Sequence, residues 1–289
     1  MVTPISTNYR GLEVVEIPPN GQGLTALVLL NILERFDLAK FDPTGPERLH
    51  LALEAARLAF GVRDAHISDP ATMREPVAGL LDKGFAGRLA KLLDPEKRVP
   101  LPKAPAPSSD TIYLTVVDRD GMAVSLINSL YSAFGTGICT ERTGVMLHNR
   151  GTGFVTEQGH PNEIAPGKRP MHTIIPALAM RNGRCEMPFG VMGADYQPMG
   201  HTHLITNMVD YGMDVQAAID HPRMFFEDDV SVVERGVPAA TVDGLKKRGH
   251  QVAVRDAPWG GGQAIVIDWE RGVLIGGSDP RKDGCALGY

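Results

Sequence analysis

The sequence of 289 residues has little cysteine, and what it has is scattered. The three cysteines, Cys139, Cys185 and Cys285, are too few and too widely spaced for a disulfide framework or a zinc site. We therefore expect buried free thiols and a reducing compartment, which favours the cytoplasm. No metal or other cofactor is expected.

The sequence also lacks an excess of positive charge and any long apolar run. With 29 lysines and arginines against 34 aspartates and glutamates, the net charge is -5 and the pI is about 6.0. No cluster of basic residues interleaved with aromatics is present, so nucleic acid is not an expected partner. No stretch has the length of a membrane span, and the first ten residues lack the pattern of a signal peptide, so no membrane association is expected.

Apolar periodicity predicts three helices in the first third of the chain, at residues 24–33, 46–62 and 77–93, after a short strand at 14–17. Charged residues on the second helix are expected at its surface or in ion pairs; they are Glu54, Arg57, Arg63 and Asp64. Residues 94–109 contain five prolines and two serines. An extended, exposed linker is expected there.

Beyond this linker, strands and helices are predicted in blocks and not in alternating βαβ units. Strands are expected at residues 144–149, 173–180, 190–192, 230–233, 263–268 and 273–276, and helices at 200–211, 214–220 and 242–248. Such an order is typical of an α+β layered fold without internal repeats. With 43% hydrophobic residues, the chain can form one large domain or two modest ones.

A predicted hairpin begins directly after the linker. Residues 110–117 carry apolar side chains on both faces of a period-two pattern, which predicts a strand covered on both sides. Turn residues at 118–121 and a second β-rich run at 122–128 complete the hairpin. Counting from the turn places Thr111 opposite Asn128 or Ser129, so the hydroxyl groups of Thr111 and Ser129 are expected within a residue of each other. Taken alone, the pattern is more typical of an ordinary buried strand than of a catalytic one.

Three other patterns resemble functional motifs, and we expect structural roles for them. His201 and His203 could share a metal if they lay on one face of a strand, but on the predicted helix they point to different sides, so surface or capping histidines are expected. The glycine clusters at 260–262 and 276–277 are expected to be turns. Near the C-terminus, a structural set of ion pairs is expected among Asp279, Arg281 and Asp283.

Sequence blocks along nearly the whole chain resemble the γ-glutamyltransferase family. The most specific block runs from Asp110 through the Phe-Gly-Thr-Gly at residues 134–137, because members of this family cut themselves just before a threonine that begins such a strand. The other blocks follow in the family's order: residues 17–25 and 57–64 upstream, then Gly-Lys-Arg-Pro at 167–170 with Ile-Pro at 175–176, Asp-Tyr-Gly at 210–212 with His-Pro-Arg at 221–223, and Gly-Ser-Asp-Pro-Arg at 277–281 with Asp-Gly at 283–284 and Gly-Tyr at 288–289.

This resemblance implies the αββα sandwich of N-terminal-nucleophile hydrolases, here incomplete because members normally carry a longer large-subunit segment upstream. Residues 1–110 correspond to the C-terminal part of the large subunit, which is helical and ends in the proline-rich linker. Residues 111–289 correspond to the small subunit, with the catalytic residue Thr111 at its N-terminus. Cleavage between Asp110 and Thr111 would leave a heterodimer of large and small subunits.

The resemblance also implies a mechanism that the chemistry of threonine permits. The hydroxyl of Thr111 would attack the carbonyl of Asp110, and the freed α-amino group, with an ordinary pKa of roughly 7.7 to 8.0, would serve as general base for its own hydroxyl. Ser129 stands where better-known members carry a threonine that touches the nucleophile. Backbone amides of Gly193 and Ala194 are the expected oxyanion hole.

Substrate-binding residues are implied at Tyr131, Arg150, Gly153, His172 and Thr173. Members that bind a γ-glutamyl group use an asparagine, a glutamine, an aspartate and two serines there, so the carboxylate expected to meet the α-ammonium group is absent. The implied activity is acyl transfer from a γ-glutamyl compound such as glutathione to water or an amino acid. Two alternatives stay open: a related acylase of the cephalosporin or glutaryl type, and a catalytically incompetent fragment.

Overall fold

The structure is a computed structural model that describes residues 1–100 and 110–289, without the side chain of Asp110. The strands are β1 (Ile5–Tyr9), β2 (Leu12–Glu16), β3 (Asp110–Val117), β4 (Ala123–Tyr131), β5 (Ala177–Arg181), β6 (Arg184–Met192), β7 (Met224–Glu227), β8 (Val230–Glu234), β9 (Gln251–Arg255), β10 (Gly261–Asp268) and β11 (Val273–Ser278). The helices are α1 (Gly23–Leu33), α2 (Pro46–His66), α3 (Val77–Leu80), α4 (Lys83–Ala90), α5 (Gln197–Val209), α6 (Val215–Asp220) and α7 (Ala239–Lys247). None of the helices in these residues is long and apolar enough to span a membrane. Most of the predicted linker at 94–109 lies outside the described residues.

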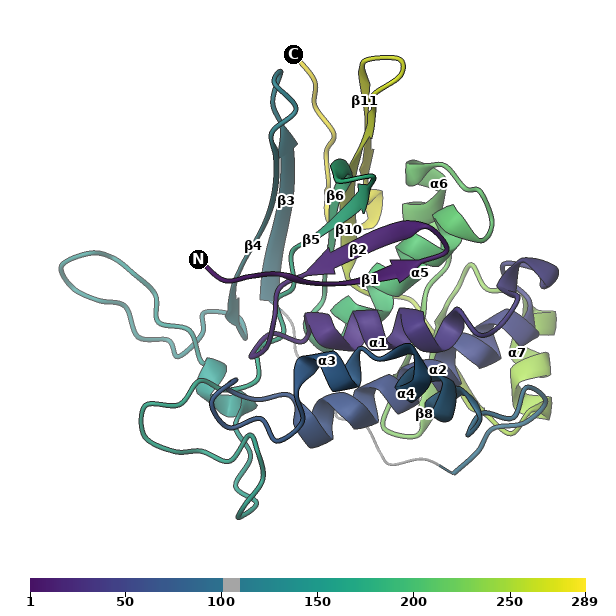
Figure 1. Ribbon diagram of the computed structural model, residues 1–289, viewed down its shortest axis with the longest axis horizontal. Helices are drawn as coiled ribbons and strands as arrows, with labels where there is room; N and C mark the ends of the chain where they lie inside the picture. Colours follow the sequence, from purple (N-terminus) through teal and green to yellow (C-terminus); the bar gives the residue numbers. More distant parts are fainter. Residues whose placement is uncertain (101–109) are drawn as a thin grey trace.

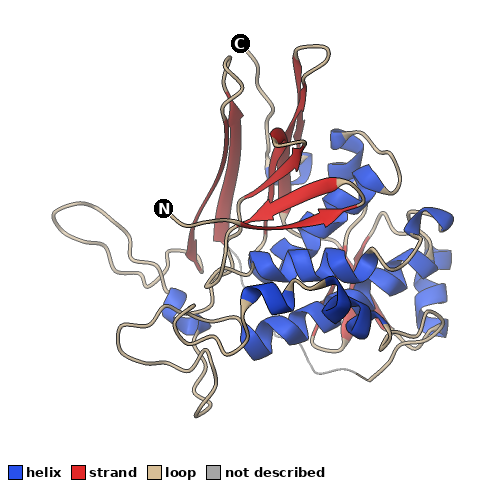
Figure 2. Ribbon diagram, in the orientation of Figure 1, coloured by secondary structure: helices blue, strands red, loops and turns tan. Residues whose placement is uncertain are grey.

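A six-stranded antiparallel sheet forms the centre of the molecule, in the order β1-β2-β5-β6-β10-β11. It combines strands from both sides of the predicted cut. Helices α1, α5 and α6 pack on one face, and the β3–β4 hairpin packs against β6 and β10 on the other (Figures 1 and 2). Side chains of β6 alternate accordingly, because Val191 contacts α5 at Gly200 while Gly190 faces the hairpin. The described chain thus forms consecutive layers of helices, sheet and hairpin, an α+β arrangement of the N-terminal-nucleophile hydrolase type.

Helix α1 is buried along its whole length. All eleven residues of Gly23–Leu33 are buried, which is typical of a helix with apolar residues all round. It packs on β1 and β2 of the central sheet on one side and on α2 on another. The layer behind the sheet is therefore two helices deep at this point.

A smaller sheet, β7-β8-β9, covers the far side of α2. Its core contains stacked aromatic rings, with Phe225 and Phe226 at 4.5 Å between centroids and Phe60 of α2 against both. Strands β8 and β9 are parallel, and a parallel pair needs a crossover connection, which α7 supplies. The expectation of no βαβ alternation is therefore wrong for this one unit.

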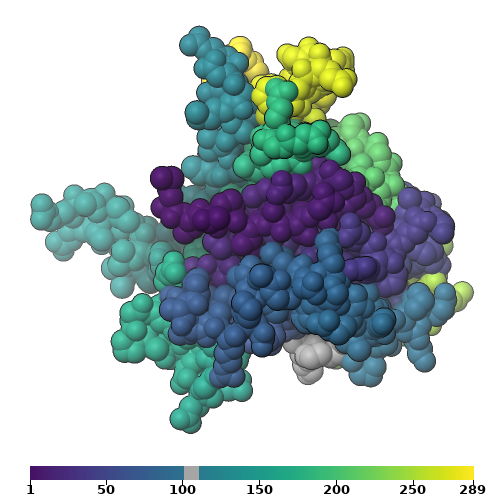
Figure 3. All heavy atoms as spheres, in the orientation of Figure 1, coloured from purple at the N-terminus to yellow at the C-terminus, as the bar shows by residue number. Residues whose placement is uncertain are grey.

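The expectation that the first hairpin strand is covered on both sides is also wrong. Ile112, Leu114 and Val116 are 62%, 41% and 46% exposed, and the side chains opposite them, Val124 and Leu126, are exposed too. Nothing within residues 1–100 and 110–289 covers this face of the hairpin. Figure 3 shows the hairpin and the loop after β4 standing out from the body of the molecule.

Several element boundaries differ from those expected. The predicted helix at 77–93 is two helices, because the side chain of Asp82 accepts the N–H of Phe85 at 2.8 Å and so caps a new helix. The predicted strand at 144–149 is reduced, in the described residues, to a single bridge between Cys139 and Met146. Strands β1, β7 and β9 were not predicted. The thiols are not buried either, since Cys139 and Cys285 are exposed and Cys185 is half-buried.

A chain of buried hydrogen bonds joins α2 to the smaller sheet. His50 Nδ1 lies 2.7 Å from His250 Nε2, and Ser231 Oγ lies 2.8 Å from His250 Nδ1. Burial lowers the pKa of His250 to about 3, with smaller electrostatic contributions from the neighbouring His50 and Arg98. His250 therefore stays neutral in the folded protein well below the ordinary histidine pKa.

We expect stability to fall as pH drops below about 6.5, since the unfolded chain then binds a proton on His250 that the folded chain refuses until about pH 3. Between about pH 7 and about pH 5, this histidine should lower the free energy of unfolding by about 1–2 kcal/mol. Urea unfolding of the wild type and His250→Gln at both pH values measures this. The variant should retain the part of the loss that comes from His172, His203 and His221, whose pKa values are also lowered by burial. Equal losses in the two proteins would contradict the assignment to His250.

Candidate active site

Thr111 and Ser129 face each other across the hairpin, as the counted register predicts. Thr111 pairs directly with Ser129, and Thr111 Oγ1 donates a hydrogen bond of 2.9 Å to Ser129 Oγ. Ser129 Oγ also accepts the backbone N–H of Tyr131 at 2.9 Å. The Thr111 hydroxyl is therefore held in one orientation at the start of β3.

The hairpin is irregular at this same point. Asp110 pairs with Tyr131 although Thr111 pairs with Ser129, so Leu130 is an extra residue in β4. Tyr131 adopts a left-handed backbone conformation with φ of 78°. A bulge of this kind bends a strand and redirects side chains, and such bulges are frequent beside active sites.

The inner face of the hairpin fixes its position on the sheet. Tyr113 is buried over Gly190, where any Cβ would overlap its ring. The Tyr113 hydroxyl lies 2.7 Å from Ser125 Oγ, which in turn accepts the N–H of Ala177 at 3.0 Å and donates to the carbonyl of Phe189 at 3.2 Å. The strand that begins at Thr111 is thus anchored to both β5 and β6.

Four of the expected substrate-binding residues lie together. Arg150 is 3% exposed; its Nη1 donates to Thr173 Oγ1, and its guanidinium carbon lies 4.8 Å from the ring centre of Tyr131. His172 is close enough for its pKa to be lowered to about 4, first by burial and then by the charge of Arg150. Burial lowers the pKa of Arg150 to about 10, so the guanidinium is charged at neutral pH.

The fifth expected residue, Gly153, contributes backbone and no side chain. It ends the short 3₁₀ turn that starts at Arg150, and its carbonyl accepts from Asn162 Nδ2 at 2.6 Å. A Cβ at this position would lie 2.9 Å from the carbonyl oxygen of Met171. An aspartate here would therefore require the backbone to shift.

The expected oxyanion turn is held in place by side chains from the first segment. Gly193 and Ala194 have φ of 141° and 47°, both in the left-handed region. Gln22 Nε2 donates 2.8 Å hydrogen bonds to the carbonyls of Ala194 and Thr173. Arg63 Nη1 in turn donates to Gln22 Oε1 at 3.0 Å and to Asp195 Oδ1 at 2.5 Å.

Sequence reasoning did not identify Gln22 and Arg63 as residues of the site. Arg63 was expected at the helix surface or in an ion pair, and it is in fact a buried ion-pair residue with 1% exposure. Glu54 and Arg57 are likewise buried and paired at 2.8 Å. Their positions could have identified them, because Gln22 and Arg63 lie in the two blocks upstream of the predicted cut that resemble the family.

A cavity of about 1270 Å³ opens beside Thr111. It lies between β3 and the edge formed by β10, β11 and the C-terminal residues 282–289, with Met192 in its wall. Arg150, His172 and Thr173 do not line it. Thr111 lines this cavity, and the expected substrate-binding residues lie outside its lining.

The two histidines of α5 are buried, so the expectation of surface or capping histidines is wrong. His201 Nε2 accepts the N–H of Val191 at 3.2 Å, so its proton is on Nδ1, which donates to Glu16 at 2.7 Å. His203 packs against His221 with ring centres 5.3 Å apart. No group of three or more potential metal ligands occurs among the described residues.

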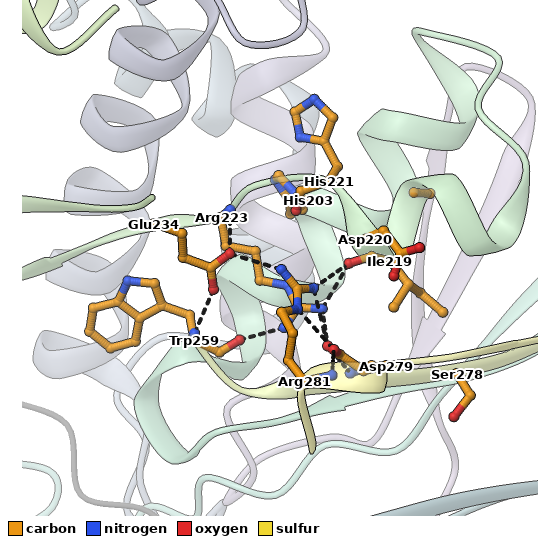
Figure 4. Close-up of polar contacts among 12 residues, drawn as sticks. His203, Ile219, Asp220, His221, Arg223, Glu234, Trp259, Ser278, Asp279 and Arg281 are labelled. Carbon is orange, nitrogen blue, oxygen red and sulfur yellow. Dashed lines mark hydrogen bonds and ion pairs between the residues drawn. The ribbon is translucent and has the colours of Figure 1, made fainter. Parts of the chain in front are cut away.

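The ion-pair set expected near the C-terminus forms around Asp279 (Figure 4). Arg223 pairs with Asp279, and Arg281 bridges Asp279 and Glu234 with 2.9 Å contacts to each. Burial alone would raise the pKa of Asp279, but the hydrogen bond from Arg281 and the charge of Arg223 hold it below its ordinary value. Asp283 is instead the left-handed residue that ends a short turn. The cluster ties β11 to the smaller sheet.

Comparison with known proteins places these features in a family context. The family model described as Gamma-glutamyltranspeptidase matches residues 1–289. The chain is 40% identical over 294 residues to the glutathione hydrolase-like YwrD proenzyme of Bacillus subtilis, covering 99% of this chain and 55% of that protein. It matches the crystal structure of cephalosporin acylase from Bacillus halodurans with a TM-score of 0.91 and 39% identity, over 100% of this chain and 54% of the other.

One solved chain, which is shorter than this protein, is matched almost completely by part of it. The T380A mutant of Helicobacter pylori gamma-glutamyltranspeptidase is 27% identical with a TM-score of 0.54, and 58% of this chain covers 98% of that chain. In contrast, this chain spans about half the length of the curated relatives that it matches.

Proposed function

Because the chain belongs to the gamma-glutamyltranspeptidase family, whose members include glutathione hydrolases and related acylases, we propose that it is part of a self-processing acyl-transfer enzyme with Thr111 as nucleophile. The observation that carries this proposal is the 2.9 Å hydrogen bond from Thr111 Oγ1 to Ser129 Oγ at the bulged start of β3. An ordinary structural strand does not require an oriented hydroxyl at its first residues.

The first step is cleavage of the bond between Asp110 and Thr111. The Thr111 hydroxyl oxygen attacks the Asp110 carbonyl carbon, and the C–N bond breaks as the hydroxyl proton passes to the leaving nitrogen. This leaves an ester between the two residues. The α-amino group of Thr111 is free from this point. Water then hydrolyses the ester, which gives a C-terminal carboxylate on Asp110 and restores the Thr111 hydroxyl.

Turnover of the acyl donor uses the same Thr111 hydroxyl together with the freed α-amino group. The freed α-amino group, with an ordinary pKa of roughly 7.7 to 8.0, takes the hydroxyl proton as Thr111 attacks the acyl donor. It passes this proton to the amine that leaves when the C–N bond of the donor breaks. Ser129 positions that hydroxyl, and the N–H groups of the Gly193–Ala194 turn stabilise the oxyanion. Water or an amino acid then accepts the acyl group from Thr111.

The two pieces are expected to remain together as a heterodimer after cleavage. Buried contacts cross the cut at several places, including Tyr9 to Asp210 at 2.7 Å, Arg48 to Asn207 at 2.6 Å and Arg63 to Asp195 at 2.5 Å. Coverage of the shorter solved chain supports the same division, since residues 111–289 are 179 of the 289 residues, or 62%, near the 58% that it matches.

The acyl donor is a γ-glutamyl compound or a related acid. Membership of the family and the glutathione hydrolase-like relative support γ-glutamyl donors such as glutathione. A second candidate is an acylase acting on donors without an α-amino group. It is supported by the match to a cephalosporin acylase and by Gly153, which leaves no carboxylate where the family places one for the α-ammonium group.

Purified protein tests both parts of the proposal. Mass spectrometry should find pieces of 110 residues, with any further segment upstream, and 179 residues. A γ-glutamyl anilide and a glutaryl anilide should both be hydrolysed, and the ratio of their kcat/KM values separates a glutathione hydrolase from an acylase. An intact chain that hydrolyses neither anilide would leave the non-catalytic alternative as the correct one.

A further inference from the structure

Arg150 presents one edge of its guanidinium group without an acceptor. Its Nη1 bonds to Thr173, but Nε and Nη2 are shielded from solvent and have no hydrogen-bond partner among the described residues. These two nitrogens donate side by side in the same direction, in the geometry that matches both oxygens of a carboxylate. A buried guanidinium edge of this kind is stable only when an anion or other acceptor completes it.

The acidic groups nearby are already engaged elsewhere. Asp195 is the carboxylate whose negative charge influences the pKa of Arg150, but its own ion pair, at 2.5 Å, is with Arg63. The second carboxylate at Arg63 is Asp64, at 2.8 Å. The buried guanidinium of Arg150 therefore carries a positive charge that makes no ion pair with a carboxylate of the described residues.

The other neighbours of Arg150 also suit an anion. The Tyr131 ring lies against the guanidinium face, and the Nε and Nη2 edge has no acceptor among the described residues. His172 Nδ1 accepts the N–H of Ile174 at 3.3 Å, so the neutral ring carries its proton on Nε2 as a further donor. Thr173 orients the guanidinium through Nη1.

We propose that Arg150 binds a free carboxylate of the acyl group while that group is attached to Thr111. The proposal rests on the proposed function, and it narrows the donors to acids with a second carboxylate, such as glutaryl or γ-glutamyl compounds. Tyr131 connects the two sites, because its N–H bonds to Ser129 beside Thr111 and its ring packs on Arg150. Gly151 and Thr152, which follow Arg150, are exposed, so this turn lies at the surface of the molecule.

A pair of donors that differ only in charge provides the test. The ratio of kcat/KM for glutaryl anilide to that for its methyl ester should favour the acid in the wild type. In Arg150→Gln, this ratio should fall on the order of 10- to 100-fold, the loss expected for a charge-assisted bidentate hydrogen bond. Arg150→Lys keeps the charge without the paired donors and should give an intermediate ratio. If Arg150 has a mainly structural role, Arg150→Gln should lower kcat/KM equally for both donors and leave their ratio unchanged. That result would overturn the proposal.

An exposed arginine in the loop after β4 serves as the matched control. Arg142→Gln removes the same charge from a residue that is exposed, and it should leave the ratio as in the wild type. If Arg142→Gln lowers the ratio as much as Arg150→Gln, general surface charge accounts for the preference and the proposal is overturned.

Binding of free glutarate separates this proposal from the proposed function. Calorimetry should detect glutarate binding to the wild type and a loss on the order of 10-fold or more in affinity in Arg150→Gln. If no anilide is turned over but glutarate binds in this Arg150-dependent way, the proposed function fails and the anion site stands. Glutarate binding that is absent, or equal in both proteins, overturns the site.

Discussion

With alanine in place of Thr111, the chain is expected to remain a single uncut polypeptide and to lose acyl turnover by roughly 10⁴-fold or more. Thr111→Ala removes the only hydroxyl proposed to attack both the Asp110 carbonyl and the acyl donor. The fold should persist, because Thr111 is only partly buried and its side-chain hydrogen bond is to Ser129. Mass spectrometry and anilide hydrolysis measure the two losses.

Two other substitutions in the same strand test whether the effect belongs to this hydroxyl. Thr111→Ser keeps a nucleophile and should be cut, though more slowly. Thr115→Ala removes a hydroxyl from the same face of β3, where Thr115 Oγ1 donates to the Val124 carbonyl at 3.0 Å, and it should be cut as in the wild type. Recovery of the 110- and 179-residue pieces from Thr111→Ala would show that another residue is the nucleophile.

The geometry around Thr111 could be predicted from local sequence because hairpin pairing is a local property. A turn at residues 118–121 and alternation on both sides fix the register, and this leaves Thr111 opposite Ser129. The bulge leaves Leu130 unpaired, so Asp110 pairs with Tyr131. The pairing of Thr111 with Ser129 is unaffected. Local periodicity was therefore sufficient to place Thr111 opposite Ser129, while the proposed role of Thr111 as nucleophile came from the family resemblance.

Burial of the hairpin could not be predicted in the same way. Apolar residues on both faces indicate that both faces favour contact with other groups, but the pattern does not identify the chain segment that supplies the contact. In the structure the inner face packs on Gly190 and Ala177, while Leu114 and its neighbours on the outer face stay exposed.

Contacts between distant segments explain the residues that sequence reasoning missed. Gln22 bonds to Ala194, which is 172 positions away, and Arg63 bonds to Asp195, which is 132 positions away. A charged residue near the end of an amphipathic helix is usually solvated, so Arg63 gave no local sign of burial. Only the tertiary fold brings it to the turn that is proposed to stabilise the oxyanion.

Replacing Arg63 by methionine is expected to reduce both stability and the rate of the chemical step. Arg63→Met leaves the carboxylate of Asp195, which is 5% exposed, without its partner, at a cost of about 3–5 kcal/mol in unfolding free energy. It also frees Gln22, whose amide holds the carbonyl of Ala194. Because Ala194 has a left-handed backbone that its surroundings must maintain, the turn should relax and kcat should fall more than KM changes.

A double variant separates the structural role of Arg63 from its proposed role in positioning the turn. Arg63→Met combined with Asp195→Leu leaves no unpaired buried charge, so stability should largely return. The rate should stay low, since the hydrogen bond from Arg63 to Gln22 is still missing and the turn is still unsupported. Thermal unfolding and kcat, measured where each variant is folded, give the two quantities.

Arg48 is the matched control for Arg63, because it is also a buried arginine that joins the segments before and after the predicted cut. It is 1% exposed, like Arg63, but it bonds to Asn207 and Thr206 of α5 and not to the Gly193–Ala194 turn. Arg48→Met should therefore lower stability while the folded fraction keeps a near-normal kcat. If the Arg63 and Asp195 double variant regained kcat together with stability, Arg63 would be a structural residue only, and the proposed support of the oxyanion turn would be wrong.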